Sequence, residues 1–155
     1  MVTNIVIAGL GGQGVLTASD ILVDAIFQTG LMVKKSEVHG MSQRGGSVCS
    51  DVRFGTTVFS PMVPPGEADF LLVLATDQVE VNRHLLKPGG VLITPESVDV
   101  NQLPDKRALN VALIGRLSRH LDTIPLEAWR EALRRNFPPA LHASNEKAFE
   151  LGRNS

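Results

Sequence analysis

The chain has 155 residues, of which 43% are hydrophobic and 20% charged. These proportions are those of a globular domain rather than of a disordered segment, and the length fits one domain over residues 1–155. With 15 basic and 16 acidic residues the net charge is −1, so no basic excess points to nucleic acid or to an anionic membrane.

Cys49 is the only cysteine in the sequence, which excludes an internal disulfide and a cysteine-ligated zinc site. An iron–sulfur cluster bound by this chain alone is excluded as well, because such a cluster takes about four thiolates. The histidines lack the spacing of metal ligands, and the start of the chain does not resemble a signal peptide. No apolar stretch approaches the ~20 residues of a membrane span. We therefore expect a cytoplasmic protein without a metal site or a membrane partner.

The first part of the chain predicts a βαβ unit with a Rossmann-like start. Ile5–Ala8 is apolar and mostly β-branched, as in a strand buried on both faces, and Gly9, Gly11 and Gly14 then match G-x-G-x-x-G. Apolar residues at helical spacing predict a helix that begins at Val15 and is closed by Gly30. Leu31–Lys35 follows as a second strand.

Two interpretations of this first glycine turn stay open. Glu37 lies about twenty residues beyond the last glycine, where a dinucleotide site places its ribose-binding acid. Alternatively, Gly11 and Gly12 permit tight packing of strand on helix, or Gln13 and the helix N-terminus face another subunit. Under either interpretation Gly14 leads into a helix N-terminus, which favours anions.

A second glycine turn carries a histidine and an arginine. Arg44, followed by Gly45 and Gly46, places a planar five-donor group beside backbone that can approach a ligand closely, which suits a carboxylate or phosphate. His39 is a candidate hydrogen-bond partner or proton carrier, although a hydrogen bond to backbone is the simpler role. Arg44 could equally pair with Glu37 or with Asp51 and pin the loop. No residue is placed to activate Cys49, which is expected to be a small core residue.

The middle of the chain predicts further strands. Ser47 to Phe54 alternates with a period of two, and Thr57–Ser60 could return beside it as a hairpin. Leu71–Ala75 is the most apolar run and is expected at the centre of the sheet. A helix over Asp77–Leu86 with Asp77 as N-cap, a turn at Pro88-Gly89-Gly90 and a strand over Val91–Thr94 follow.

The remainder is predicted to be helical after a loop over Pro95–Lys106. Helices are expected over Ala108–Leu121, where Gly115 marks close packing, from Pro125 to about residue 137, and over Leu141–Leu151, ended by Gly152. The predicted fold is a three-layer α/β/α arrangement with a mixed, largely parallel sheet. No nucleophile motif, carboxylate pair or metal cluster emerges, so no catalytic residue is predicted.

Several motifs resemble the gamma-type domain of 2-oxoacid:ferredoxin oxidoreductases. The resemblance lies in Gly9–Val15, in Ser36–Val48 and in Gly66–Asp69, and it continues through Leu86–Gly90 and Asn110–Gly115. It spans most of the chain. The version with His-Gly-Met-Ser-Gln-Arg-Gly-Gly is most similar to the beta subunit of indolepyruvate:ferredoxin oxidoreductases.

This resemblance implies a subunit that is inactive alone and works in the coenzyme A-dependent oxidative decarboxylation of an arylpyruvate, with electrons passed to ferredoxin. It places thiamine diphosphate, Mg²⁺ and [4Fe-4S] clusters on a large partner chain, which agrees with the single cysteine here. Gly11, Gly12, Gln13 and Gly14 match the first motif. The second motif contains His39, Arg44, Gly45 and Gly46.

One departure from the family pattern is expected to matter. Family members usually carry a further helix and strand before the helix at Ala108, whereas only Thr94 to Arg107 joins these elements here. The sheet of this chain is therefore expected to be trimmed, or its partner to act on another 2-oxoacid.

The alternative from the residues alone is a free-standing dinucleotide-binding or regulatory Rossmann-like module.

Overall fold

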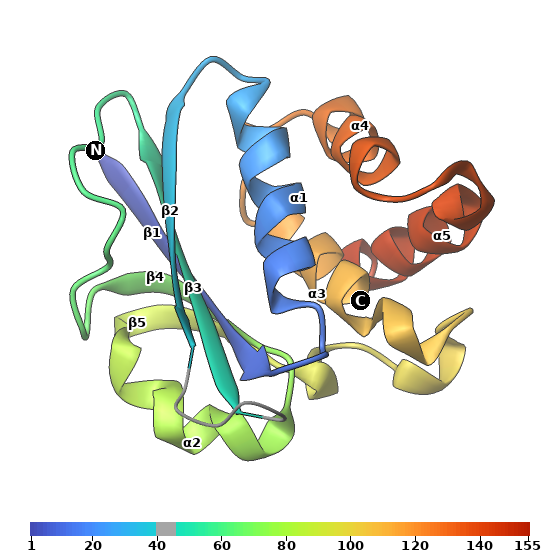
Figure 1. Cartoon of the computed structure of the whole chain (residues 1–155), viewed down its shortest axis with the longest axis horizontal. Coiled ribbons are helices and arrows are strands. Elements are labelled where there is room, and N and C mark those ends of the chain that lie inside the picture. Colours follow the sequence, from blue (N-terminus) through green and yellow to red (C-terminus); the bar gives the residue numbers. More distant parts are fainter. Residues whose placement is uncertain (40–45) are drawn as a thin grey trace.

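The computed structural model describes residues 1–39 and 46–155, and a five-stranded mixed sheet forms the centre of this part of the chain (Figure 1). The spatial order is β2-β3-β1-β4-β5. The strands are β1 (Val2–Leu10), β2 (Met32–His39), β3 (Ser47–Gly55), β4 (Ala68–Val73) and β5 (Leu86–Ile93). β1 runs parallel to β4, and β4 to β5, whereas β3 is antiparallel to both β1 and β2. The predicted α/β fold with a mixed sheet is confirmed.

The central strand is β1, which has two strands on each side of it. Its segment Ile5–Ala8 is at most 1% exposed, as the apolar run predicted. The expectation that Leu71–Ala75 occupies the centre was wrong. β4 ends at Val73 and lies one strand away from the centre. Both runs are fully covered, so apolar character alone could not rank them.

The predicted βαβ unit exists in chain order but not as a pair of neighbouring strands. β1, helix α1 (Val15–Phe27) and β2 follow one another, yet β3 lies between the two strands. The hairpin expected at Thr57–Ser60 does not form, and this segment is irregular. The reason is that β1 and β2 already occupy both edges of β3, so a returning strand has no free partner.

The helices form unequal layers on the two faces of the sheet (Figure 1). One face is covered by α1, α3 (Leu109–Ser118), α4 (Leu126–Asn136) and α5 (His142–Arg153), which enclose the larger core. The other carries α2 (Val79–Asn82) and a loop that inserts Val63 above Val6 and Leu71. In the described residues no helix has the length and apolar character needed to cross a membrane.

The connection between β4 and β5 differs from its prediction. Only α2 is α-helical in the segment expected as one helix, with 3₁₀ turns over Thr76–Gln78 and Arg83–Leu85. Asp77 lies inside the first of these turns and does not cap it. Only Val79 and Asn82 are buried in α2, so little packing supports a longer helix.

The sequence Pro88-Gly89-Gly90 is not a separate turn, because β5 runs through it. The strand register jumps from Ala68 opposite Leu86 to Phe70 opposite Val91, which makes this stretch of β5 a bulge. By contrast, the predicted loop over Pro95–Lys106 contains no strand or α-helix and only short 3₁₀ turns, as expected.

Two glycines let α3 and α5 cross with their backbones in contact. A Cβ atom added at Gly115 would lie 2.1 Å from the carbonyl oxygen of Phe149, which confirms the predicted close packing. A Cβ at Gly152 would lie 1.7 Å from the carbonyl oxygen of Ala112. The prediction that Gly152 ends the last helix was wrong, because α5 continues to Arg153. Its role is contact between helices.

We predict that Gly152→Ala lowers the free energy of unfolding by about 2–3 kcal/mol, because the added methyl group overpacks a backbone contact. Helix propensity alone predicts the opposite sign, a gain of about 1 kcal/mol. Urea unfolding measures the difference. As a control, Ala143→Gly at an exposed position of α5 should cost about 1 kcal/mol through propensity. An unchanged or raised stability of Gly152→Ala would contradict the packing role.

Candidate functional site

The first glycine turn connects the end of β1 to the start of α1. Gly12 and Gly14 have φ angles of +89° and +84°, a region that L residues with side chains rarely adopt. The backbone N–H of Gln13 donates to the carbonyl oxygen of Leu10 at 3.2 Å. Glycine at these positions is therefore required by the backbone path itself.

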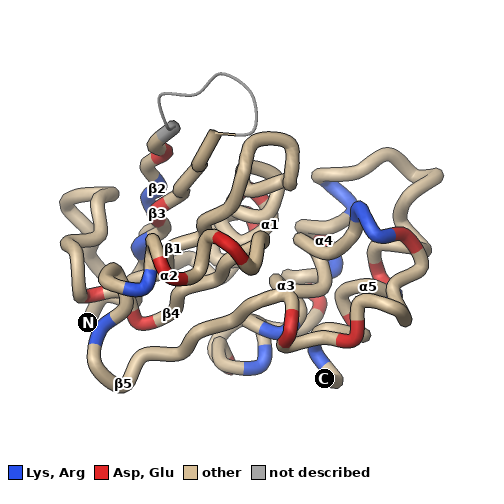
Figure 2. Tube along the Cα trace, turned by 90° about the horizontal axis from the view of Figure 1, so that it is seen from below, with Lys and Arg blue, Asp and Glu red and all other residues tan. Residues whose placement is uncertain are grey.

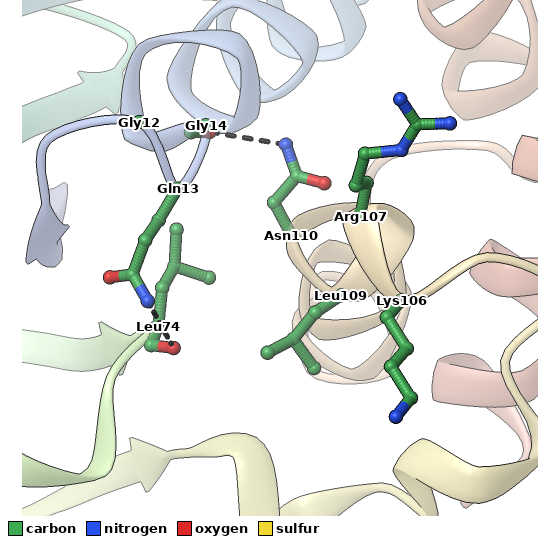
Figure 3. A pocket seen from close by; sticks show the side chains of 8 residues that line it. All are labelled: Gly12, Gln13, Gly14, Leu74, Lys106, Arg107, Leu109 and Asn110. Atoms are coloured by element: carbon green, nitrogen blue, oxygen red, sulfur yellow. Dashed lines mark hydrogen bonds between the residues drawn. The ribbon is translucent and has the colours of Figure 1, made fainter.

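The side chain of Gln13 ties this turn to the neighbouring strand. Its Oε1 accepts a hydrogen bond from the backbone N–H of Leu10 at 2.7 Å, and its Nε2 donates to the carbonyl oxygen of Leu74 at 3.5 Å (Figure 3). Leu74 directly follows β4. Both ends of the Gln13 amide thus have backbone partners, so its first role in this chain is to hold the turn.

The two glycine motifs of the sequence meet at the same end of the sheet. The backbone N–H of Gly11 donates to the carbonyl oxygen of Gly46 at 2.8 Å, and Leu10 stands opposite Ser47 in the β1–β3 ladder. His39 is the last residue of β2 and lies opposite Val48. Arg44 and Gly45, together with the side chain of His39, lie outside the described residues, so their predicted roles stay predictions.

The carboxylates proposed as partners of Arg44 have other contacts. Glu37 forms an ion pair with Lys35 at 2.8 Å. Asp51 accepts a hydrogen bond from the backbone N–H of Val63 at 2.9 Å.

The strand order also differs from the order that a dinucleotide site requires. In that fold the acid stands on the strand next to the glycine turn. Here β3 separates β2, which carries Glu37, from β1, a displacement of about 4.8 Å per added strand. The dinucleotide hypothesis therefore loses the placement on which it depended.

An open cavity of about 370 Å³ lies beside the glycine turn (Figure 3). It sits beyond the carboxyl ends of the parallel strands β1 and β4, where the chain leaves in opposite directions, towards β2 and β5. Ligand sites of open α/β sheets occur at such switch points. Its lining combines backbone, amides, cations and leucines, namely Gly12, Gln13, Gly14, Leu74, Lys106, Arg107, Leu109 and Asn110.

Five of these eight residues were not predicted as site residues from the sequence, and three of the five, Asn110, Lys106 and Arg107, carry polar or charged side chains. Asn110 reaches towards Gly14 across the cavity, whereas Lys106 and Arg107 lie in the 3₁₀ turn that leads into α3 (Figure 3). They lie more than ninety positions from the glycine turn in the sequence, so no local pattern joins them to it. The sequence offered one signal for Asn110, which is the first residue of the segment Asn110–Gly115 that resembles the family.

The described residues that line the cavity include two cations, Lys106 and Arg107, and no acidic residue. Elsewhere along the trace, acidic and basic residues are interspersed (Figure 2). The N-terminus of α1 opens beside the cavity, and helix N-termini attract anions. Arg107 pairs with Asp105 at 2.9 Å and holds the pKa of that carboxyl below its usual range. Lys106 has no ion-pair partner within the described residues.

Cys49 is half-buried on β3, away from this cavity. Its Sγ donates to Oδ1 of Asn82 at 3.5 Å. Burial, with a smaller contribution from Asp51, raises the pKa of the Cys49 thiol, which keeps it protonated at neutral pH. This environment supports the predicted role as a core residue and not as a nucleophile.

We predict that Cys49 in the folded chain reacts more slowly with iodoacetamide at pH 8 than a free cysteine does, by about tenfold or more, because both access and thiolate fraction are reduced. Mass spectrometry of the alkylated chain measures the rate. Denaturation in urea should restore the ordinary rate, and rapid labelling of the folded chain would disprove the assignment.

The fold matches gamma-type domains of solved oxidoreductases. The chain is similar to the gamma subunit of a keto/oxoacid ferredoxin oxidoreductase from Geobacter sulfurreducens, with a TM-score of 0.82 and 22% identity over 99% of this chain and 95% of that one. It is also similar to part of the 2-oxoglutarate:ferredoxin oxidoreductase from Magnetococcus marinus, solved with 2-oxoglutarate, coenzyme A and succinyl-CoA bound. There the TM-score is 0.84 and the identity 20%, over 99% of this chain and 30% of that one.

Sequence comparison identifies the family. A family model described as pyruvate ferredoxin/flavodoxin oxidoreductase matches residues 4–107, and the chain belongs to this family. Two curated relatives are named indolepyruvate oxidoreductase subunit IorB. The one from Pyrococcus horikoshii is 35% identical and the one from Thermococcus kodakarensis 37%, each over 96% of this chain and 93% of the relative. The resemblance stated from the motifs is thereby confirmed.

The same alignments support a trimmed chain. They extend over 191 positions, more than the 155 residues present here, so the relatives carry residues that this chain lacks. That these residues are missing between Thr94 and Arg107 stays a prediction.

Proposed function

We propose that this chain is a non-autonomous subunit of a ferredoxin-dependent 2-oxoacid oxidoreductase, acting as one gamma-type domain over residues 1–155 in a cytoplasmic complex. The observation that carries the proposal is the likeness to two IorB subunits over nearly the whole chain. The cavity is consistent with a supporting role, because its lining offers shape and positive charge. The reactive centre is assigned to a larger partner chain.

The proposed reaction is a coenzyme A-dependent oxidative decarboxylation. The carboxylate of the 2-oxoacid leaves as CO₂, and the acyl group passes to the thiol of coenzyme A, which releases its proton. The electron pair left behind reduces ferredoxin. Indolepyruvate or another arylpyruvate is the proposed substrate, because the relatives similar over most of this chain bear that name.

The cofactors of this chemistry do not fit the residues of this chain. A [4Fe-4S] cluster needs about four thiolates, and the sequence has one cysteine. Within residues 1–39 and 46–155, no three His, Cys, Asp or Glu side chains gather as a metal site would require. We therefore assign the clusters, Mg²⁺ and thiamine diphosphate to the partner, where thiamine diphosphate supplies carbanion stabilisation.

The part assigned to this chain is recognition of an anionic portion of coenzyme A. The proposed surface comprises Gly11, Gly12, Gln13 and Gly14 with His39, Arg44, Gly45 and Gly46. Three features support it: the hydrogen bond between Gly11 and Gly46, the N-terminus of α1, and the cations at the cavity wall. A phosphate group is the kind of anion that backbone N–H groups and guanidinium groups bind together.

The first test is reconstitution with the large subunit encoded in the same organism. We expect the purified chain alone to show no turnover, and the complex to reduce ferredoxin with indolepyruvate and coenzyme A. Pyruvate and 2-oxoglutarate should give kcat/KM values lower by about tenfold or more, since an aryl pocket discriminates by contact area. Turnover by the isolated chain, or no turnover by a complex that holds all cofactors, would refute the proposal.

The second test concerns the arginine of the second motif. We predict that Arg44→Ala raises the KM for coenzyme A by about tenfold, as expected for loss of one charge-assisted contact, with kcat little changed. Arg130→Ala on α4, where the arginine lies 3.9 Å from Glu150, serves as the matched control and should leave this KM unaltered. If Arg44→Ala weakens assembly and leaves the KM unchanged, the second turn is a docking element instead.

A further inference from the structure

Asn110 is a buried polar residue whose side chain joins two helix starts. Only 6% of it is exposed. Its Nδ2 donates to the carbonyl oxygen of Gly14 at 3.2 Å, and its Oδ1 accepts from the backbone N–H of Val111 at 2.9 Å. Gly14 immediately precedes α1, and Asn110 and Val111 lie in the first turn of α3. One amide therefore fixes the N-termini of both helices relative to each other.

The contact leaves no room for a side chain at position 14. The carbonyl oxygen of Gly14 also accepts the first helical hydrogen bond of α1, from the backbone N–H of Ala18 at 2.9 Å. A Cβ atom at position 14 would lie 2.3 Å from Nδ2 of Asn110. The absent side chain at Gly14 thus makes room for the amide, in addition to allowing the positive φ angle.

The cavity between these helix starts depends on their separation. Gly12, Gln13 and Gly14 form one wall, and Lys106, Arg107 and Leu109 form the other. Asn110 is the lining residue that bridges the two walls by a hydrogen bond (Figure 3). Both helices direct the positive ends of their dipoles to the cavity, and their effect on a bound anion falls off within about one turn. Small changes in separation therefore change the field that an anion meets.

We propose that Asn110 is a positioning residue that holds α1 and α3 at the separation needed for the cavity to bind an anionic group of coenzyme A. The inference rests on the proposed function for the ligand and on the observed hydrogen bonds for the geometry. Asn110 acts through the backbone of the glycine turn and is not itself assigned a step of the reaction.

Two substitutions separate geometry from charge. Asn110→Ala removes the bridge and leaves the charge of the cavity unaltered. Asn110→Asp keeps the shape of the side chain but replaces the Nδ2 donor with a carboxylate oxygen, which repels the carbonyl oxygen of Gly14. The new negative charge also opposes the cations at the cavity wall. A carboxylate in the first turn of α3 is favourable to the helix, so Asn110→Asp should remain folded.

In the reconstituted complex, we expect the KM for coenzyme A to rise about threefold in Asn110→Ala and about thirtyfold or more in Asn110→Asp, with kcat within about twofold of wild type. In the free chain, amide hydrogen exchange at Ala18, whose N–H donates to the carbonyl oxygen of Gly14, should accelerate about tenfold in Asn110→Ala, because the bridge to Gly14 is lost.

Asn82→Asp is the matched control. Asn82 is 8% exposed, and its Nδ2 donates to the backbone carbonyl oxygen of Gln78 at 2.8 Å, on the opposite face of the sheet. It should lose stability without a change in the KM for coenzyme A. A wild-type complex without turnover refutes the proposed function, whereas an active wild type with an unchanged KM in Asn110→Asp refutes this inference alone. Faster exchange with an unchanged KM also overturns it, because Asn110 would then be structural only.

Discussion

The pairing of β1 on both edges is the constraint on which the remaining structure depends. One edge is bonded to β3 in antiparallel register and the other to β4 in parallel register. This double pairing carries the glycine turn at the end of β1 to a point between the end of β4 and the beginning of β3. The contacts of Gly11 with Gly46 and of Gln13 with Leu74 follow from that placement. The cavity exists because α3 begins opposite the same point.

Local patterns predicted the elements well where a single physical signal decides. The β-branched run at Ile5–Ala8 became a strand, and apolar residues at helical spacing became α1, α3, α4 and α5. The alternation in Ser47–Phe54 became β3. Each of these signals is carried by neighbouring residues, because burial of one helix face or one strand face leaves a period in the sequence.

The strand order, the role of Gly152 and the lining of the cavity could not be predicted for one shared reason, which is contact between distant segments. No local sequence pattern shows that β3 inserts between β1 and β2. The hypothesis that Glu37 binds the ribose of a dinucleotide could therefore be tested only by the strand order. Gly152 resembles a helix end in sequence, yet it is a point of contact with α3. Asn110 is 96 residues from Gly14 and could not be joined to it by spacing. The motif resemblance recovered the family, whereas the geometry of the cavity required the fold.

The sheet order also has a consequence for how the chain folds during synthesis. β1 is made first, but its partners β3 and β4 begin at Ser47 and Ala68. Until both have left the ribosome, this central strand exposes unpaired amides and carbonyls. Folding from these long-range pairings is slow, and edges left open in the meantime invite aggregation.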